Sequence, residues 1–149
     1  MRVFLDANIL FSAAHRAENS VRALFRLAES GACELIASAF AVDEARRNIA
    51  RKHPARAVDL EQLIARLAIC QEPAAEDVRW ARSAGLPEKD APILAAAARA
   101  RAGMLVTGDR ADFGALYEKK LRGVEVLPPR IAIERILAAA LHARRESKR

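Results

Sequence analysis

The chain has 149 residues, of which 52% are hydrophobic and 30% are charged, and it contains only 6 Gly and 6 Pro. This composition is typical of a single globular domain with enough apolar residues for a core, and it excludes collagen-like, disordered and multidomain chains. The formal net charge of +6 is compatible with a polyanionic partner, but residues 142–149 alone carry four basic groups and one acidic group.

Five short apolar or β-branched runs are predicted as strands: Val3–Leu5, Glu34–Ala37, Leu67–Cys70, Met104–Thr107 and Val124–Leu127. Longer stretches rich in Ala, Leu, Arg and Glu are predicted as helices: Ser20–Ser30, Ala39–Lys52, Ala55–Arg66, Ala75–Ala84, Ala91–Ala102 and Ile131–Ala143. Alternating strands and helices predict a parallel sheet covered by helices. We expect one domain over residues 1–143, followed by a basic tail over residues 144–149.

Glycines follow several of the predicted helices, where a left-handed residue commonly ends a helix. We expect this role for Gly31, Gly85, Gly103 and Gly123.

Cysteine and histidine spacing argues against zinc or disulfide chemistry. Cys33 and Cys70 have no Cys-x-x-Cys spacing, and no apolar stretch is long enough to cross a bilayer, so we expect a protein of the reducing cytoplasm without signal peptide or membrane span. His15, His53 and His142 are scattered along the chain, and we expect each of them at the surface.

Five acidic residues are expected at one edge of the predicted sheet. Asp6 follows the first strand, and Asp109 and Asp112 follow the fourth. Asp90 precedes the helix that leads into the fourth strand, and Glu44 lies in the first turns of the helix after the second. Ligands of parallel α/β sheets bind beyond the carboxyl ends of the strands, where the strand order reverses.

Each acid alone also has a purely structural explanation. Asp6 can close a strand with an Asx turn, Asp90 can cap a helix, Asp109 can lie in a turn, and Glu44 can be a solvated helix residue. Together, however, clustered carboxylates repel one another unless a cation is present. Oxygen ligands favour a hard ion, Mg²⁺ or Mn²⁺, which is the chemistry of metal-dependent nucleases and phosphatases.

Four motifs in this order resemble the PIN domain nucleases over residues 3 to about 128. They are VFLDANIL at 3–10, DEARR at 43–47, LPEKDAPILAAA at 86–97 and LVTGD at 105–109. The resemblance implies a three-layer α/β/α sandwich with a five-stranded parallel sheet. It also implies a ribonuclease that hydrolyses RNA phosphodiester bonds with Mg²⁺ or Mn²⁺.

The resemblance also assigns individual residues. The acidic quartet of the family, which binds metal and is catalytic, falls on Asp6, Glu44, Asp90 and Asp109. Accessory polar positions fall on Asn8, Ser12 and Thr107, and an additional acid of some members falls on Asp112. Candidate contacts for RNA phosphates on or near the helix of Glu44 are Arg46, Arg47, Arg51 and Lys52, with a solvated basic face as the alternative.

The family consists largely of small prokaryotic toxins of toxin-antitoxin pairs, and a chain this short resembles that group. This implies a cognate antitoxin as partner. Phe11, Phe25, Phe40 and the Ala-rich helices supply apolar surface that suits a homodimer. A stand-alone RNA-processing nuclease and a catalytically silent RNA-binding module of the same fold are the alternatives.

Three rival folds are disfavoured by residues at the strand ends. A receiver domain needs Asp at the end of the third strand, where this chain has Gln71. An aspartate-nucleophile phosphatase needs Asp-x-Asp after the first strand, where Asn8 takes the second place. A dinucleotide-binding Rossmann domain needs a glycine-rich turn there instead.

Overall fold

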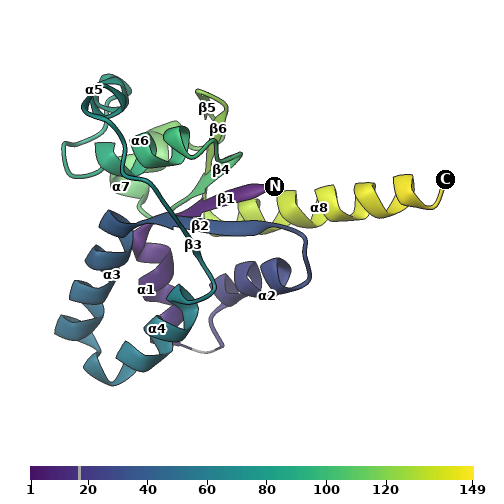
Figure 1. Cartoon of the computed structure of the whole chain (residues 1–149), viewed down its shortest axis with the longest axis horizontal. Coiled ribbons are helices and arrows are strands. Elements are labelled where there is room, and N and C mark those ends of the chain that lie inside the picture. Colours follow the sequence, from purple (N-terminus) through teal and green to yellow (C-terminus); the bar gives the residue numbers. More distant parts are fainter. Residues whose placement is uncertain (17) are drawn as a thin grey trace.

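A single mixed sheet organises the computed structural model, which describes residues 1–16 and 18–149 (Figure 1). Over these residues the strand order is β3-β2-β1-β4-β6-β5. The strands are β1 (Arg2–Leu5), β2 (Glu34–Ser38), β3 (Ala68–Cys70), β4 (Met104–Val106), β5 (Lys120–Leu121) and β6 (Val124–Leu127). All neighbours pair in parallel except β5, which is antiparallel to β6.

The described helices are α1 (Ala7–His15), α2 (Ala23–Glu29), α3 (Ala39–Lys52), α4 (Ala57–Ile64), α5 (Ala75–Ser83), α6 (Ala91–Arg99), α7 (Arg110–Phe113) and α8 (Pro129–Ser147). Short 3₁₀ turns occur at Ser20–Arg22, Pro54–Arg56 and Gly114–Leu116. Among these residues, no helix combines the length and the hydropathy that a membrane crossing requires.

The predicted fold class is confirmed, with one difference in the sheet. The five predicted parallel strands correspond to β1, β2, β3, β4 and β6. The additional strand, β5, has two residues and forms a hairpin with β6. Its residues, Lys120 and Leu121, show no strand pattern, so only pairing with β6 marks them as a strand.

Apolar residues cover both faces of the sheet and produce three layers. Side chains of successive strand residues point to opposite faces. Val3 and Leu5 therefore pack with α1, α2, α3, α4 and α8, whereas Phe4 between them packs with α6 and α7. All three are fully buried. Because both faces of the central strands are apolar, helices must cover both of them.

The last helix, α8, is longer than the sequence predicts at both ends. It begins at Pro129, where proline needs no hydrogen-bond partner in the first turn, and it continues to Ser147. Residues 144–147 of the predicted tail therefore form its last turn, which projects beyond the sheet in Figure 1.

The order of the strands places a reversal between β1 and β4. From β1 the chain adds β2 and β3 on one side, and it then returns to add β4, β6 and β5 on the other. The loops that leave β1 and β4 therefore meet at the carboxyl edge. The Asp6 amide donates to the Val106 carbonyl over 3.0 Å, which joins the ends of these two strands.

Candidate active site

Asp6 lies at the junction of β1 and α1 and is only 4% exposed. Its Oδ1 accepts a hydrogen bond from the Ala7 amide at 2.7 Å, so it caps the first turn of α1. Its Oδ2 accepts from the Thr107 hydroxyl at 2.8 Å and from Asn8 Nδ2 at 3.1 Å. The carboxylate is thereby held in one orientation at the sheet edge.

Asn8 and Thr107 bridge the loops after β1 and β4. The Asn8 Oδ1 accepts from the Gly108 amide at 2.9 Å, and its Nδ2 lies 3.2 Å from Thr107 Oγ1. Thr107 Oγ1 also accepts from the Asp109 amide at 3.2 Å. Through these bonds Asp6 and Asp109, far apart in the sequence, have a fixed separation.

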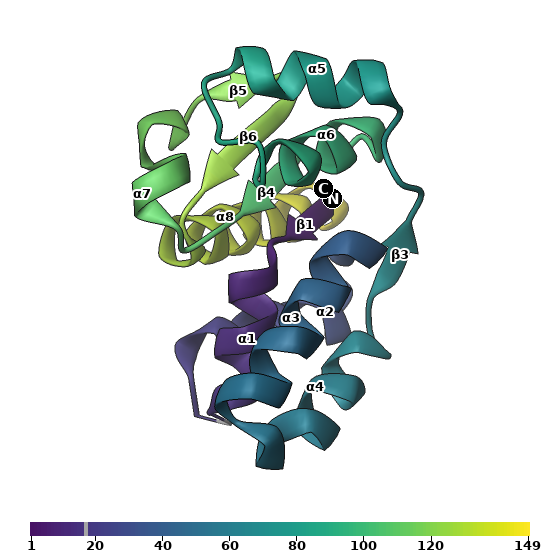
Figure 2. The same cartoon turned by 90° about the vertical axis from the view of Figure 1, so that its left-hand side faces the viewer.

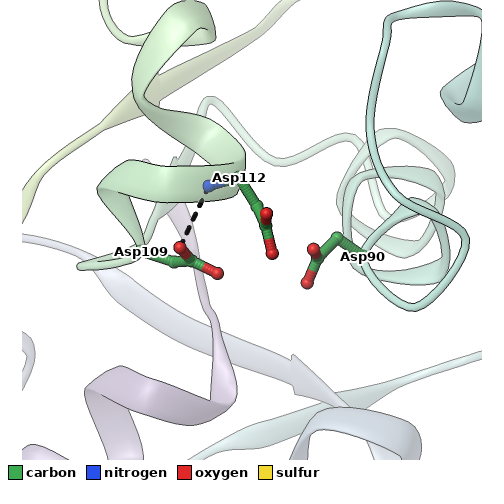
Figure 3. Close-up of side chains that lie close together, drawn as sticks. All are labelled: Asp90, Asp109 and Asp112. Atoms are coloured by element: carbon green, nitrogen blue, oxygen red, sulfur yellow. Dashed lines mark hydrogen bonds between the residues drawn. The ribbon is translucent and has the colours of Figure 1, made fainter.

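Asp90, Asp109 and Asp112 converge at the starts of α6 and α7 (Figure 3). Each offers one carboxylate oxygen, and these three oxygens lie within 4.8 Å of one another. Asp109 caps α7 and accepts from the Asp112 amide at 3.1 Å. The third carboxylate comes from the other side, where Asp90 precedes the first residue of α6.

Asp90 occupies an N-cap position without acting as a cap. Its side chain makes no capping hydrogen bond, and its Oδ2 is buried with no hydrogen-bond partner among the described residues. Figure 3 shows this carboxyl pointing toward that of Asp112. Two facing carboxyl groups with no donor between them require a proton or a cation.

The electrostatics of the cluster agree with that requirement. The pKa of Asp6 is raised to about 6, mainly by burial and also by the nearby charges of Glu44 and Asp109, against the opposing hydrogen bonds from Thr107 and Ala7. Burial, followed by the shared proton and charge of Asp112, raises the pKa of Asp90 to about 7.

The pKa of Asp112 is shifted in the opposite direction to that of Asp90. The pKa of Asp112 is lowered because a protonated Asp90 can donate a hydrogen bond to it, and Lys89 lowers it as well. The Lys89 Nζ lies 3.4 Å from Asp112 Oδ2, although the lysine is mostly exposed. When the pair holds one proton, that proton therefore lies on Asp90.

The remaining predicted site residues surround this cluster at different distances. Glu44, in α3, is close enough for its charge to raise the pKa of Asp6. Ser12, in α1, lines a cleft of about 390 Å³ together with Asn8 and Asp109. Ser12 Oγ also accepts a hydrogen bond from Asn19 Nδ2 at 2.8 Å.

The four basic residues predicted to contact RNA phosphates differ in the interactions that they already make within the chain. Arg46 donates to Glu61 at 2.7 Å and 3.0 Å, and it lies 3.7 Å from Asp43. Arg51 donates to Asn48 at 3.3 Å. Lys52 places its Nζ 5.5 Å from the centre of the Phe11 ring. Arg47 is exposed on the same helix, α3.

The ligand atoms that the trio offers fit a hard divalent cation. Asp90, Asp109 and Asp112 offer only oxygen, the ligand atom that Mg²⁺ and Mn²⁺ prefer. The unpartnered Asp90 Oδ2 is the specific observation in favour, because a bound cation would supply its missing partner. Asp6 and Glu44 lie next to this trio rather than within it.

A PIN domain family model matches residues 2–111 of this chain. The chain belongs to the PIN domain family. The match includes Asp6, Glu44, Asp90 and Asp109, and it ends one residue before Asp112. No curated protein sequence matches the chain.

Solved structures show the same PIN fold at low sequence identity. PAE2754 from Pyrobaculum aerophilum has a TM-score of 0.67 and 18% identity, over 93% of this chain and 96% of that one. VapBC2 from Rickettsia felis, bound to a DNA fragment from its promoter, has a TM-score of 0.63 and 18% identity, over 86% of this chain and 98% of that one. VapC20 from Mycobacterium tuberculosis, a sarcin-ricin loop cleaving toxin, has a TM-score of 0.55 and 15% identity, over 76% of this chain and 93% of that one.

Sequence reasoning missed three features of this PIN domain. Lys89 pairs with Asp112 inside the acidic cluster, although its place beside Asp90 in the third motif could have drawn attention to it. The Tyr117 hydroxyl donates to the Thr107 carbonyl at 2.8 Å and thus supports the loop after β4. His15 and His53, expected at the surface, are both partly exposed, but their spacing did not reveal that they stack with ring centres 3.9 Å apart.

Proposed function

We propose that this PIN domain is a Mg²⁺- or Mn²⁺-dependent endoribonuclease that hydrolyses RNA phosphodiester bonds. The observation that carries the proposal is the trio Asp90, Asp109 and Asp112, with an unpartnered buried oxygen on Asp90. Membership of a nuclease family and the placement of the trio at the strand reversal support it.

The residues of the chain have distinct roles in this proposal. Asp90, Asp109 and Asp112 would hold the cation, and Asp6 and Glu44 would complete or extend its ligand set. When bound, a divalent cation polarises phosphoryl oxygens and lowers the pKa of water. Asn8 and Thr107 keep the Asp6 carboxylate in place through the two bonds to its Oδ2. Such outer partners typically matter 10- to 100-fold for metal affinity or activity, as an order of magnitude.

The expected products follow from attack by water in line with the leaving 3′ oxygen. The water oxygen forms a bond to phosphorus, the bond between phosphorus and the 3′ oxygen breaks, and the 3′ oxygen takes up a proton that the water releases. The phosphate stays on the 5′ oxygen of the downstream nucleotide. The 2′ hydroxyl is not required. Both chain ends can be identified on the products, so this route is distinguishable from 2′-hydroxyl attack, which leaves a cyclic phosphate.

We further propose that the protein is the toxin of a toxin-antitoxin pair, with a cognate antitoxin that binds near the catalytic cleft, and that it forms a homodimer in the cytoplasm. The family resemblance and the fold shared with VapBC2 from Rickettsia felis support the antitoxin. A stand-alone RNA-processing nuclease of the same mechanism is the second candidate. A short neighbouring reading frame that encodes a DNA-binding protein, and whose product inhibits this chain, would favour the toxin.

Purified protein incubated with single-stranded RNA tests the nuclease. We expect cleavage with Mg²⁺ or Mn²⁺ that leaves 5′-phosphate ends, and its loss in EDTA or in the variant Asp109→Asn. Glu134→Gln is the matched control, because it removes one negative charge from an exposed position of α8 that does not belong to the acidic trio. Cleavage that persists in EDTA would contradict the proposal, and RNA binding without any cleavage would indicate a catalytically silent module.

A further inference from the structure

One face of α1 leads from the acidic cluster to a second group of side chains. Phe11 and Ser12 lie three and four residues after Asn8, His15 lies three residues after Ser12, and all four are partly exposed, so they lie on one face of the helix. Asn8 touches Asp6 at one end of this face. His15, nine residues after Asp6, lies about 14 Å along the helix at 1.5 Å per residue.

Helix α3 runs beside α1 in the same direction (Figure 2). Both helices begin at the carboxyl ends of neighbouring parallel strands, β1 and β2. The face of α3 that begins with Glu44 near Asp6 continues through Asn48 to Lys52, at spacings of four residues. The Lys52 ammonium then lies over the Phe11 ring, 5.5 Å from its centre.

At the far end of these two helices, three aromatic rings form a cluster. His15 and His53 stack at 3.9 Å between ring centres, with 25° between their planes. Phe11 lies 6.0 Å from His15 and 5.8 Å from His53. The His15 Nδ1 is buried and has no hydrogen-bond partner among the described residues. Loss of solvent, followed by the charges of His53, Arg16 and Arg56, lowers the pKa of His15.

The cluster opens into a pocket of about 540 Å³ with a mainly basic lining. Its side chains include Arg16, Lys52 and Arg56, and Glu18 is its single acid among the described residues. Arg56 is paired with Asp59 at 3.2 Å, whereas Arg16 and Lys52 form no ion pair with an acidic side chain in the part of the chain that the structure describes. Flat rings next to unpaired cations match a nucleotide, which offers a base to stack and a phosphate to bind.

We propose that this pocket, hereafter the His15–His53 pocket, binds a nucleotide of the single-stranded RNA substrate at a distance from the scissile bond. The base stacks on the imidazole rings, and Arg16 and Lys52 contact the phosphates. This inference rests on the proposed ribonuclease function. At about 3.4 Å per stacked nucleotide, 14 Å corresponds to about four nucleotides between Asp6 and the pocket.

The test compares RNA lengths rather than overall activity. Labelled single-stranded RNAs of three and nine nucleotides are titrated onto the full chain carrying Asp109→Asn, in Mg²⁺, with binding read from fluorescence anisotropy. Only the longer RNA can occupy both the cluster and the pocket. We expect it to bind at least about tenfold more tightly, and we expect His53→Ala to remove most of that advantage.

Two further variants separate stacking and charge from a loss of structure. His53→Phe restores a flat ring, so it should recover most of the advantage of the longer RNA. Arg16→Gln should weaken binding of the longer RNA more than Arg145→Gln does, although both remove one exposed positive charge. Arg16→Gln should also make the affinity depend less steeply on salt concentration. Thermal melting checks that each variant is folded.

The outcomes for the pocket and for the nuclease are distinguishable. An unchanged advantage of the longer RNA in both His53→Ala and Arg16→Gln overturns the pocket, whether or not the wild-type chain cleaves RNA. If the length dependence is lost in these variants while the wild type shows no metal-dependent cleavage, the nuclease fails and the pocket stands as an RNA-binding site.

Discussion

The variant Asp90→Asn should stabilise the protein when no metal is present. The pKa of Asp90 rises from 3.8 to about 7, so ionising this group opposes folding, and the cost develops as the pH rises through that range. Roughly three pKa units at about 1.36 kcal/mol each give about 4 kcal/mol. Because the carboxyl is partly exposed, solvent screening reduces this to about 1–2 kcal/mol.

The size of this effect is within reach of thermal melting. At pH 8 in EDTA, Asp90→Asn should melt about 2–8 °C above wild type, since 1 kcal/mol corresponds to about 2–4 °C in a chain of this size. At pH 5 the difference should shrink, because wild-type Asp90 is then largely protonated. An amide at this position can also donate to Asp112, which replaces the shared proton at any pH.

Metal should reverse the order of the two melting temperatures. A cation at about 100 times its dissociation constant stabilises wild type by about 2.7 kcal/mol and stabilises the variant much less. Glu134→Gln serves as the control for removal of a charge and should respond to metal as wild type does. If wild type melts identically in EDTA and in Mn²⁺, or if Asp90→Asn is no more stable than wild type at pH 8 in EDTA, the reasoning about this carboxyl pair is refuted.

Three further outcomes are expected. Thr107→Val removes the hydroxyl that donates to Asp6 and should lower RNA cleavage about 10- to 100-fold, whereas Thr107→Ser should retain most of it in the same kinetic assay. Because the pKa of Asp6 is raised to about 6, the stability that its protonated form contributes is present below about pH 4 and is lost as the pH rises through 6. The melting temperature in EDTA should therefore fall between pH 5 and pH 8, and a melting temperature that does not change with pH would count against a raised pKa. Phe113→Ala empties a fully buried position under β4 and should cost about 3–5 kcal/mol, seen as a lower urea midpoint with an unchanged slope; a cost below 1 kcal/mol would contradict the packing described.

The main strands and helices were predictable because their patterns are local. Short apolar runs predicted the parallel strands, and Ala-rich segments predicted the helices between them. Helix α3 was predicted at its observed bounds, Ala39–Lys52. Helix α1 was not predicted, because it follows β1 directly and only the Asp6 cap separates the two elements. The hairpin strand β5 was missed for a different reason, since its two residues become a strand only through pairing.

Backbone conformation was less predictable than element type. Gly31 and Gly85 have positive φ after α2 and α5, as expected. Gly103 does not, because Arg101 takes the left-handed conformation after α6 with a φ of 57°. Gly123 has positive φ, but in the turn between β5 and β6 rather than after a helix. A single sequence shows where a helix can end but not which residue adopts the strained conformation.

The location of the acidic edge could be predicted, whereas the grouping within it could not. The strand order decides which loops meet, and chain order alone indicated Asp6, Asp90 and Asp109. Asp112 was predicted as auxiliary, yet the structure places it in the trio and leaves Asp6 and Glu44 beside it. The direction of each side chain depends on caps and partners such as Lys89, which no spacing rule provides.

The bond between Thr107 and Asp6 also has a consequence for when activity can arise. Its partners lie 101 positions apart in the sequence, so the acidic edge of the sheet closes a loop of about a hundred residues and is among the last parts to assemble. A nascent chain that has only β1, β2 and β3 holds Asp6 and Glu44 but lacks the trio. At about 5–20 residues per second, some seconds of synthesis separate the first of these acids from the last. If the proposed function holds, the ribosome therefore completes most of the domain before the new chain can cut RNA.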